Sequence, residues 1–172
     1  MADARTTHPW LWRAGSRQRS GEYAPEDALA HCNQPLMTDA TGATYTVTKF
    51  ADLSAARSFA SRYARGLGLP GERVADLELI VTELATNSLE HANSACRLAF
   101  WRYGGQLVCE ARDDGRLDDP LAGRLAPKPD EATGRGLFLV NALADLVRSH
   151  TTHRGTTINA HLRLACTAQI AS

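Results

Sequence analysis

Apolar residues recur at helical spacing over the stretch from about Gly71 to Ala92. At about 100° per residue, the large apolar side chains of this long helix fall within one arc, and a serine falls with them. We expect that arc to face a sheet. Its members are Leu77, Ile80, Val81, Leu84 and Ser88.

Two further segments carry helical signals. Asp52 or Ser54 can cap a helix that extends to about Arg65, and the following "GLGLPG" supplies the glycines and proline that helix ends prefer. The later stretch "GRGLFLVNALADLV" predicts a helix with one apolar stripe. That stripe consists of Leu137, Val140, Ala144 and Val147.

The remaining periodic segments are typical of strands. "TYTVTKF" is rich in strand-forming residues, and "CRLAFWRY" and "QLVCEARD" are separated by Gly104-Gly105, which is a hairpin signal. "THRGTTINAHLRLA" predicts one or two closing strands. Helices together with hairpin-linked strands, and without a parallel βαβ rhythm, predict an α+β two-layer sandwich.

The chain divides into three parts. Residues 1–42 contain prolines and turn formers with little periodicity, and predict an irregular flank or linker with a short helix at Pro25–Cys32. Residues 43–166 carry the periodic pattern and are expected to form one domain, and residues 167–172 a tail. Within the domain, a loop rich in Pro, Gly and Asp is expected from Gly115 to Thr133.

A second, polar arc lies beside the apolar arc of the long helix. It is displaced by roughly a quarter turn, at the edge of the buried face, where a cleft between helix and sheet would open. The amide oxygen of Asn87 is a suitable ligand for Mg²⁺, and Glu83, one turn earlier, can accept a proton. The alternative is a solvated polar flank. The arc consists of Asp76, Glu83, Asn87 and His91.

Two loops are expected to meet this arc. Strand alternation points Asp113 inward, where the exocyclic amine of adenine can donate to it, and Gly115 lets a ring approach the backbone. The alternative is that "DDG" is only a turn. Gly134 and Gly136 precede a helix whose free N–H groups, with Arg135 alongside, form a plausible phosphate cradle, although many such glycines only cap helices. No Walker A loop occurs.

Composition narrows the class of protein. The chain of 172 residues has 19 Lys+Arg and 19 Asp+Glu, so its global charge favours neither a nucleic-acid nor a membrane partner. Cys32, Cys96, Cys109 and Cys166 lack the spacing of a zinc site or disulfide framework, which favours reduced thiols. No secretory signal and no membrane-spanning apolar run is visible, so we expect a cytoplasmic protein.

The order of these motifs resembles the histidine-kinase-like ATPase superfamily, which includes sensor kinases, gyrase and MutL. "ELATNSLEHA" looks like its N-box, "DDG" like its D-x-G motif, "GRGLFLV" like its G-x-G motif, and "RGTTI" like the late strand near the adenine pocket. The resemblance covers about Thr44 to Leu164. It implies the Bergerat fold, in which a mixed, mostly antiparallel sheet is covered by helices on one face.

Within the superfamily, the resemblance is strongest to the anti-sigma factor serine/threonine kinases of bacteria. These combine Glu and Asn one turn apart with a following His, and they favour a compact form of the G-x-G helix that matches Gly134 to Asp145. The resemblance implies ATP and Mg²⁺ as ligands, with Glu83 as the general base and Asn87 as the Mg²⁺ ligand. The implied nucleotide-binding residues are Asn87, His91, Asp113, Gly115, Lys128, Gly134, Arg135, Gly136, Leu137 and Thr156.

The same resemblance implies an activity and partners. Such proteins sequester a sigma factor and phosphorylate a Ser or Thr of an anti-anti-sigma partner of the STAS class; a homodimer is a further arrangement found among relatives. Leu117 to Thr133 would form a short ATP lid, with Lys128 reaching the terminal phosphate. The chain departs from the pattern at Arg116, where sensor kinases have a second glycine, and at Thr156-Thr157, where some relatives have a lysine.

Two other functions stay open at this point. One is a nucleotide-dependent regulatory binding module without kinase activity, which the retained Glu83 disfavours. The other is the ATP-binding domain of a sensor histidine kinase, which is disfavoured because no phosphoacceptor-histidine helix precedes the domain. A gyrase- or MutL-type ATPase is disfavoured because no transducer domain follows Leu164.

Overall fold

A five-stranded sheet forms one layer of the fold, and its strands lie in the order β1-β2-β3-β5-β4. The computed structural model describes residues 35–38, 41–119, 122–124 and 135–165. All four strand pairings are antiparallel. The strands are β1 (Ala43–Val47), β2 (Cys96–Tyr103), β3 (Gln106–Asp113), β4 (Leu146–Thr152) and β5 (Gly155–Arg163).

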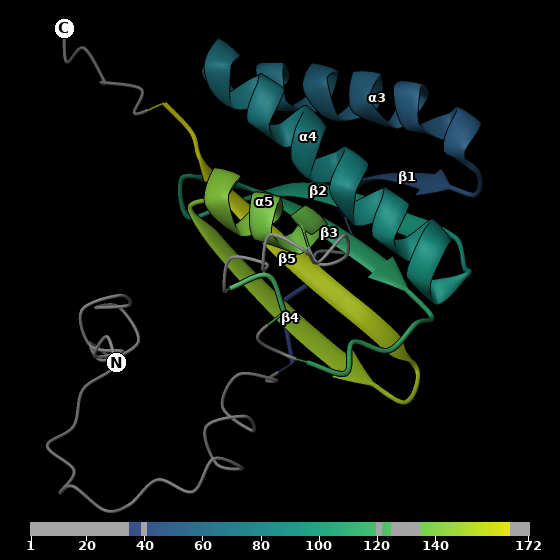
Figure 1. Cartoon of the computed structure of the whole chain (residues 1–172). Helices are drawn as coiled ribbons and strands as arrows, with labels where there is room; N and C mark the ends of the chain where they lie inside the picture. Colours follow the sequence, from purple (N-terminus) through teal and green to yellow (C-terminus); the bar gives the residue numbers. More distant parts are fainter. Residues whose placement is uncertain (1–34, 39–40, 120–121, 125–134, 166–172) are drawn as a thin grey trace, which may run out of the picture.

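Helices cover one face of this sheet (Figure 1). The predicted α+β two-layer sandwich is therefore confirmed, although the sheet is antiparallel at every described pairing where a mixed sheet was expected. The helices are α3 (Leu53–Gly66), α4 (Gly71–Asn87) and α5 (Arg135–Leu143), with a 3₁₀ turn η2 (Phe50–Asp52) before α3 and a π-helical turn η3 (Ser88–Ala92) after α4.

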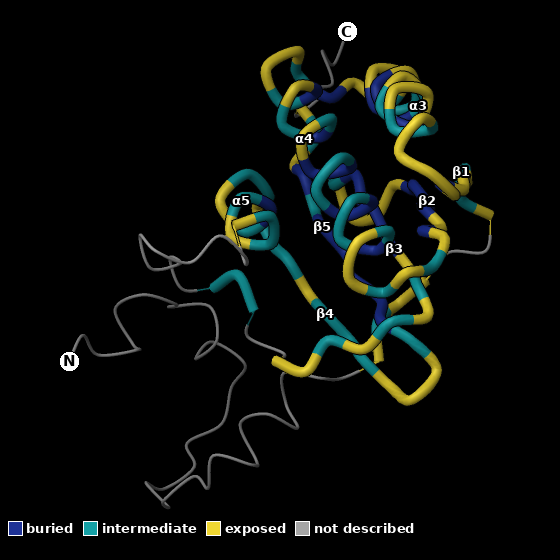
Figure 2. The backbone as a smooth tube through the Cα atoms, turned by 45° about the vertical axis from the view of Figure 1, so that its right-hand side comes forward, coloured by how far each residue is buried: buried dark blue, intermediate teal, exposed yellow. Residues whose placement is uncertain are grey.

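The hydrophobic core lies between α3, α4 and the sheet. Figure 2 shows that buried residues concentrate on the sides of the helices and strands that face one another. On α3 the buried positions are mainly alanines one turn apart, which lets α4 pack closely against it. The predicted apolar arc of α4 is buried in full. The core residues of these two helices are Ala56, Ala60, Ala64, Val74, Leu77, Ile80, Val81, Leu84 and Ala85.

The hairpin between β2 and β3 forms where the sequence predicts it. Gly104 and Gly105 have φ angles of 53° and 78°, and two successive positive φ values are typical of the type I′ turn that suits a two-residue hairpin. At the end of α3, Gly68 also has a positive φ of 82°, as a left-handed helix terminus requires. Asp52 precedes α3, but its carboxylate accepts hydrogen bonds from Thr48 and Lys49 instead of capping that helix.

The last helix is shorter than predicted. The expected helix extends to Val147, whereas α5 ends at Leu143 and Val147 lies in β4. The chain leaves the helix because the N–H of Asp145 donates to the carbonyl of His161 on β5 at 2.9 Å, which starts the sheet pairing. The Asp145 carboxylate then accepts from the N–H of Arg163 and from the guanidinium of Arg73, both at 2.8 Å.

Several predictions concern residues outside the described ranges. The short helix at Pro25–Cys32, Lys128 and Gly134 lie outside the described residues, and the division into flank, domain and tail stays a prediction. The two described cysteines, Cys96 and Cys109, are buried and free. No helix in the described ranges is both long and apolar enough to cross a bilayer.

Candidate functional site

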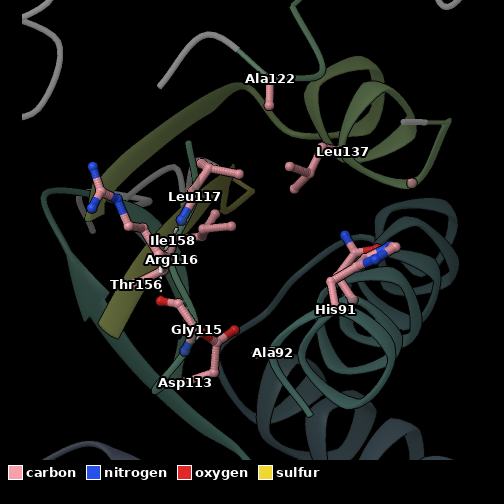
Figure 3. Close-up of a pocket in the computed structure, with 12 residues that line it drawn as sticks. His91, Ala92, Asp113, Gly115, Arg116, Leu117, Ala122, Leu137, Thr156 and Ile158 are labelled. Atoms are coloured by element: carbon pink, nitrogen blue, oxygen red, sulfur yellow. Dashed lines mark hydrogen bonds between the residues drawn. The ribbon is translucent and has the colours of Figure 1, made fainter. Parts of the chain in front are cut away.

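A cavity of about 260 Å³ opens between the end of α4 and the sheet. Its volume is close to the lower limit of roughly 300 Å³ typical of small-molecule sites. In Figure 3, His91 approaches it from the helical side, while Asp113 and Thr156 approach from the strands. The lining residues are Asn87, His91, Ala92, Asp113, Gly115, Arg116, Leu117, Ala122, Gly136, Leu137, Thr156 and Ile158.

Asp113 ends β3 on the same face as the buried Leu107 and Cys109, as strand alternation predicts. Its carboxylate is held at both oxygens: the Ser88 hydroxyl donates to Oδ2 at 2.6 Å and the Gly115 N–H donates to Oδ1 at 2.9 Å. A carboxylate has about four lone-pair sites. Acceptor capacity is therefore left for a ligand donor such as an exocyclic amine.

Ser88 is the donor that sequence reasoning missed. It lies on the sheet-facing arc of the helix and is only 1% exposed, so it looks in the sequence like a core position. Its neighbour Cys96 is also fully buried, and burial raises the pKa of that thiol to about 11, so the thiol stays protonated at neutral pH. The carboxylate of Asp113 therefore meets neutral groups on its protein side.

The first turn of α5 packs directly on the polar arc of α4. A Cβ atom placed on Gly136 would lie 2.6 Å from Glu83 Oε2 and 3.2 Å from Asn87 Oδ1, so a side chain at this position would displace the ends of the Glu83 and Asn87 side chains. The first N–H groups of a helix have no intrahelical partner and carry a partial positive charge. The contact therefore places a potential anion-binding helix terminus beside a carboxylate and an amide.

A magnesium nucleotide is compatible with this donor set. Mg²⁺ keeps several waters and takes the rest of its ligands from substrate phosphates plus one or two protein oxygens. Asn87 offers one such oxygen at the cavity wall, next to the start of α5. Among the residues that the structure describes, no group of three or more His, Cys, Asp or Glu side chains could hold a metal without a nucleotide.

Gly115 and Thr156 shape the loop that leaves β3. A Cβ atom on Gly115 would collide with Cβ of Ala92 at the end of η3, so the helix, and not only a ligand ring, requires glycine here. The Thr156 hydroxyl donates to the Gly115 carbonyl at 2.9 Å and accepts from the Leu117 N–H at 3.1 Å. Thr156 thus lines the cavity, while its hydroxyl hydrogen is used within the protein.

The structure brings most of the predicted site residues together. Glu83 does not line the cavity but contacts Gly136 behind it, and Arg135 is exposed at the start of α5. The predicted residues at the cavity wall are Asn87, His91, Asp113, Gly115, Gly136, Leu137 and Thr156. Leu117 and Ala122, which also line the cavity, belong to the segment predicted as the ATP lid, whereas Ala92, Arg116 and Ile158 were not predicted.

Only one of these missed residues had a usable signal. Ile158 follows Thr156 by two residues on β5, so strand alternation places both side chains on one face. Ala92 reaches the cavity because it lies at the end of η3, and periodicity does not predict the path of the chain there. Arg116 is strongly exposed and pairs with Asp118 at 3.4 Å, so it places a positive charge at the rim of the cavity.

Comparison with known proteins gives a family match. The family model described as histidine kinase-like ATPase domain matches residues 47–162. No curated protein matches the chain. The structure of the RsbU and RsbW domains of Rv1364c from Mycobacterium tuberculosis is similar with a TM-score of 0.52 and 18% identity, over 71% of this chain and 32% of that chain. At this identity the likeness shows a shared fold.

A second solved structure is also similar. The blue-light activated histidine kinase EL346 of Erythrobacter litoralis matches with a TM-score of 0.46 and 21% identity, over 69% of this chain and 42% of that chain. The present chain thus spans about a third of the first of these structures and less than half of the second.

Proposed function

The chain belongs to the histidine kinase-like ATPase family, and on that premise we propose that it is an ATP-binding anti-sigma regulatory factor. In this proposal it phosphorylates a Ser or Thr of an anti-anti-sigma (STAS) partner and sequesters a sigma factor. The observation that supports the proposal is the close approach of Gly136, in the first turn of α5, to the side chains of Glu83 and Asn87, the residues proposed as general base and Mg²⁺ ligand.

The base of ATP would occupy the cavity beside Asp113. The adenine amine would donate to the carboxylate, which Ser88 and Gly115 hold in place. Leu137 and Ile158 supply apolar surface at the same wall. The Asp113 carboxylate accepts hydrogen bonds and does not donate them. At the ring position that faces Asp113, this arrangement therefore favours a purine with an amine over one with a carbonyl.

The phosphates would extend towards the start of α5. The N–H groups of its first turn would bind them, and Asn87 Oδ1 would be the protein ligand of Mg²⁺. Bound Mg²⁺ would neutralise negative charge on the phosphate oxygens. Lys128 and Gly134 are proposed to contact the phosphates, as the family resemblance implies.

Glu83 is proposed to be the general base. The hydroxyl proton of the partner's Ser or Thr would pass to the Glu83 carboxylate while the hydroxyl oxygen bonds to the γ-phosphorus and the bond to the leaving ADP oxygen breaks. The proximity of Glu83 to Gly136 supports this role, because it places the carboxylate beside the helix start that would hold the phosphates.

A second candidate function is a nucleotide-dependent binding module without catalysis. It is favoured by one observation: Glu83 lies behind Gly136 and is not among the residues that line the cavity. Under this alternative, nucleotide binding alone would control how the protein holds its partner, and replacing Glu83 would leave that control intact.

Phosphate transfer from γ-labelled ATP separates the two candidates. The purified chain is incubated with Mg²⁺, labelled ATP and STAS proteins of the source organism. We expect acid-stable label on Ser or Thr, and a decrease of at least about 100-fold in rate for Glu83→Gln, since general base catalysis contributes roughly 10²–10⁴-fold. ATP affinity should change little, because Glu83 is not part of the cavity wall.

Glu90→Gln is the matched control. Glu90 is exposed on η3, seven residues further along the same helix, and should transfer phosphate at the wild-type rate. Transfer by Glu83→Gln at the wild-type rate would exclude this residue as the base. Acid-labile label on histidine would point instead to a histidine kinase.

A further inference from the structure

The guanidinium of Arg73 joins three elements of the fold. Its Nη1 donates to Asp76 Oδ2 at 2.6 Å and to the carbonyl of Leu143 at 2.7 Å, and its Nη2 donates to Asp145 Oδ2 at 2.8 Å. Arg73 and Asp76 lie near the start of α4, and Leu143 is the last residue of α5. The same Asp145 oxygen accepts from the N–H of Arg163 on β5 at 2.8 Å. One side chain, which we call the Arg73 clamp with its three acceptors, therefore attaches the end of α5 to α4 and, through Asp145, to β5.

The contacts of Arg73 with α5 explain its position better than its own helix does. In the first turn of α4, a cation meets the positive end of the helix dipole, which is unfavourable. At the end of α5, the last carbonyl groups have no intrahelical partner, and a cation is favourable. The side chains of Arg73 and Asp145 are only 24% and 30% exposed, so solvent screens this pair less than a fully exposed ion pair. Asp76, a member of the polar arc of α4, holds the guanidinium from the other side.

α5 is a short helix with few buried residues. It has nine residues, fewer than the roughly 12–15 that an isolated helix needs in water, and Val140 alone among them is buried. Contacts at its two ends therefore contribute to where it lies on α4. Those contacts are the Arg73 clamp at Leu143 and the close approach of Gly136 to Glu83 and Asn87. At 1.5 Å per residue, the two ends are about 10 Å apart along the helix.

We propose that Arg73 is a positioning residue for the phosphate-binding part of the site. By clamping the end of α5 to α4, it sets the separation between the first turn of α5 and Asn87. Arg73 is fourteen residues before Asn87 on α4, about 21 Å along the helix, and it does not line the cavity, so it acts only through α5. This inference rests on the nucleotide contacts proposed above.

NMR titration of the full-length protein with ATP and with adenosine tests this role, since NMR detects weak as well as tight binding. Adenosine has the base that would occupy the cavity beside Asp113 but no phosphates, so it does not need the first turn of α5. Arg73→Met retains a long side chain without a donor. We expect it to weaken ATP binding at least about five-fold, the lower end of typical coupling between separate sites, and to leave adenosine affinity unchanged. A residue that only stabilises the fold would not separate the two ligands.

Two further variants distinguish the clamp from a simple effect of charge on an anionic ligand. Arg62→Met removes the same charge from an exposed position on α3 and should bind ATP as wild type does. Asp145→Ala removes a negative charge, which by itself would favour an anion, but it also breaks the clamp, so ATP affinity should again fall at least about five-fold. In the double variant of Arg73 and Asp145, the two losses should not add, because both remove the same contact.

Hydrogen exchange of the nucleotide-free protein gives a readout that does not depend on a ligand. Amides of α5 should exchange faster in Arg73→Met than in wild type, and those of α3 should keep their rates. Unchanged ATP affinity, an equal loss of ATP and adenosine affinity, or unchanged exchange in α5 would overturn the inference while the proposed function stands. Wild-type protein that binds neither ligand would instead contradict the proposed function, and with it the inference that rests on it.

Discussion

The Asp113 carboxylate is positioned by one group that is distant in the sequence and one that is two residues away. Ser88 is the first residue of η3, directly after α4, and Gly115 lies in the loop after β3. Each donates a hydrogen bond to one carboxylate oxygen. A buried carboxylate without donors would be costly, so these bonds allow Asp113 to point into the cavity before any ligand is present. In the proposed function, this arrangement preorganises Asp113 to accept a hydrogen bond from the base of the nucleotide.

Glu110 differs from Asp113, whose carboxylate accepts two hydrogen bonds. Burial raises the pKa of Glu110 and so favours its neutral form. Its Oε2 is buried without a donor, and Oδ1 of the cross-strand partner Asn159 also lacks one. Glu110→Gln removes the charge and supplies an N–H donor. We expect the free energy of unfolding at pH 7 to rise by about 1 kcal/mol, the contribution of one hydrogen bond.

The pH dependence of this effect follows from the raised pKa of Glu110. At pH values below the usual pKa range of glutamate, the side chain is protonated in both the folded and the unfolded protein. The gain in stability from glutamine is therefore smallest there. As the pH rises, the folded protein must bury a carboxylate and loses stability relative to the variant. Urea unfolding between pH 4 and 8 measures the difference; an advantage that grows towards low pH would contradict this account.

Part of this residue-level picture could be predicted from the sequence. Strand alternation alone gives the inward direction of Asp113, and helical periodicity gives the neighbouring positions of Glu83 and Asn87. The contact of Ser88 with Asp113 and the collision that Ala92 would make with a side chain at Gly115 could not be predicted. Both depend on how closely η3 approaches β3 in space.

Among the helices, the contact between α4 and α5 determines the geometry of the site. It passes through Gly136, whose missing side chain leaves room for Glu83 and Asn87. In Gly136→Ala, alanine favours the helix by about 1 kcal/mol, which offsets part of the crowding. We therefore expect unfolding stability to change by less than about 1 kcal/mol, while ATP affinity falls at least about ten-fold because the amide and the helix start move apart.

Calorimetric titration with ATP and urea unfolding measure these two quantities. Gly66→Ala is the control, since Gly66 ends α3 with no atom within 4 Å of an added Cβ and without a positive φ. It should leave ATP affinity unchanged. Equal affinity in Gly136→Ala and wild type would show that the close approach is not needed for binding.

Element boundaries were predictable where the sequence contains a local stop signal. β2 and β3 agree with their predicted segments because two glycines separate them, and α3 ends at the predicted glycine-rich stretch. The end of α5 was predicted wrongly, because the apolar spacing continues to Val147. What ends this helix is pairing of Asp145 with β5, which is a tertiary contact that periodicity does not contain.

At the scale of the whole molecule, the two faces of the sheet carry different side chains. The helical face carries the cavity and the proposed nucleotide contacts, and the opposite face carries exposed arginines, Arg148 among them, and the segment around Met37. The central strands β3 and β5 contribute side chains to both faces. Replacing Arg148, on the opposite face, should therefore leave the proposed nucleotide contacts intact.

The central claim is that the cavity binds ATP through Asp113, and calorimetric titration with Mg²⁺ and ATP tests it most directly. Asp113→Asn is the test variant. Asp114→Asn is its matched control, because Asp114 is the next residue in the chain and is exposed. We predict saturable binding for wild type and Asp114→Asn, and affinity at least about ten-fold weaker for Asp113→Asn, since hydrogen bonds to charged groups contribute roughly 1.5–3 kcal/mol. No binding by the folded wild-type protein, or equal affinity in Asp113→Asn, would contradict the claim.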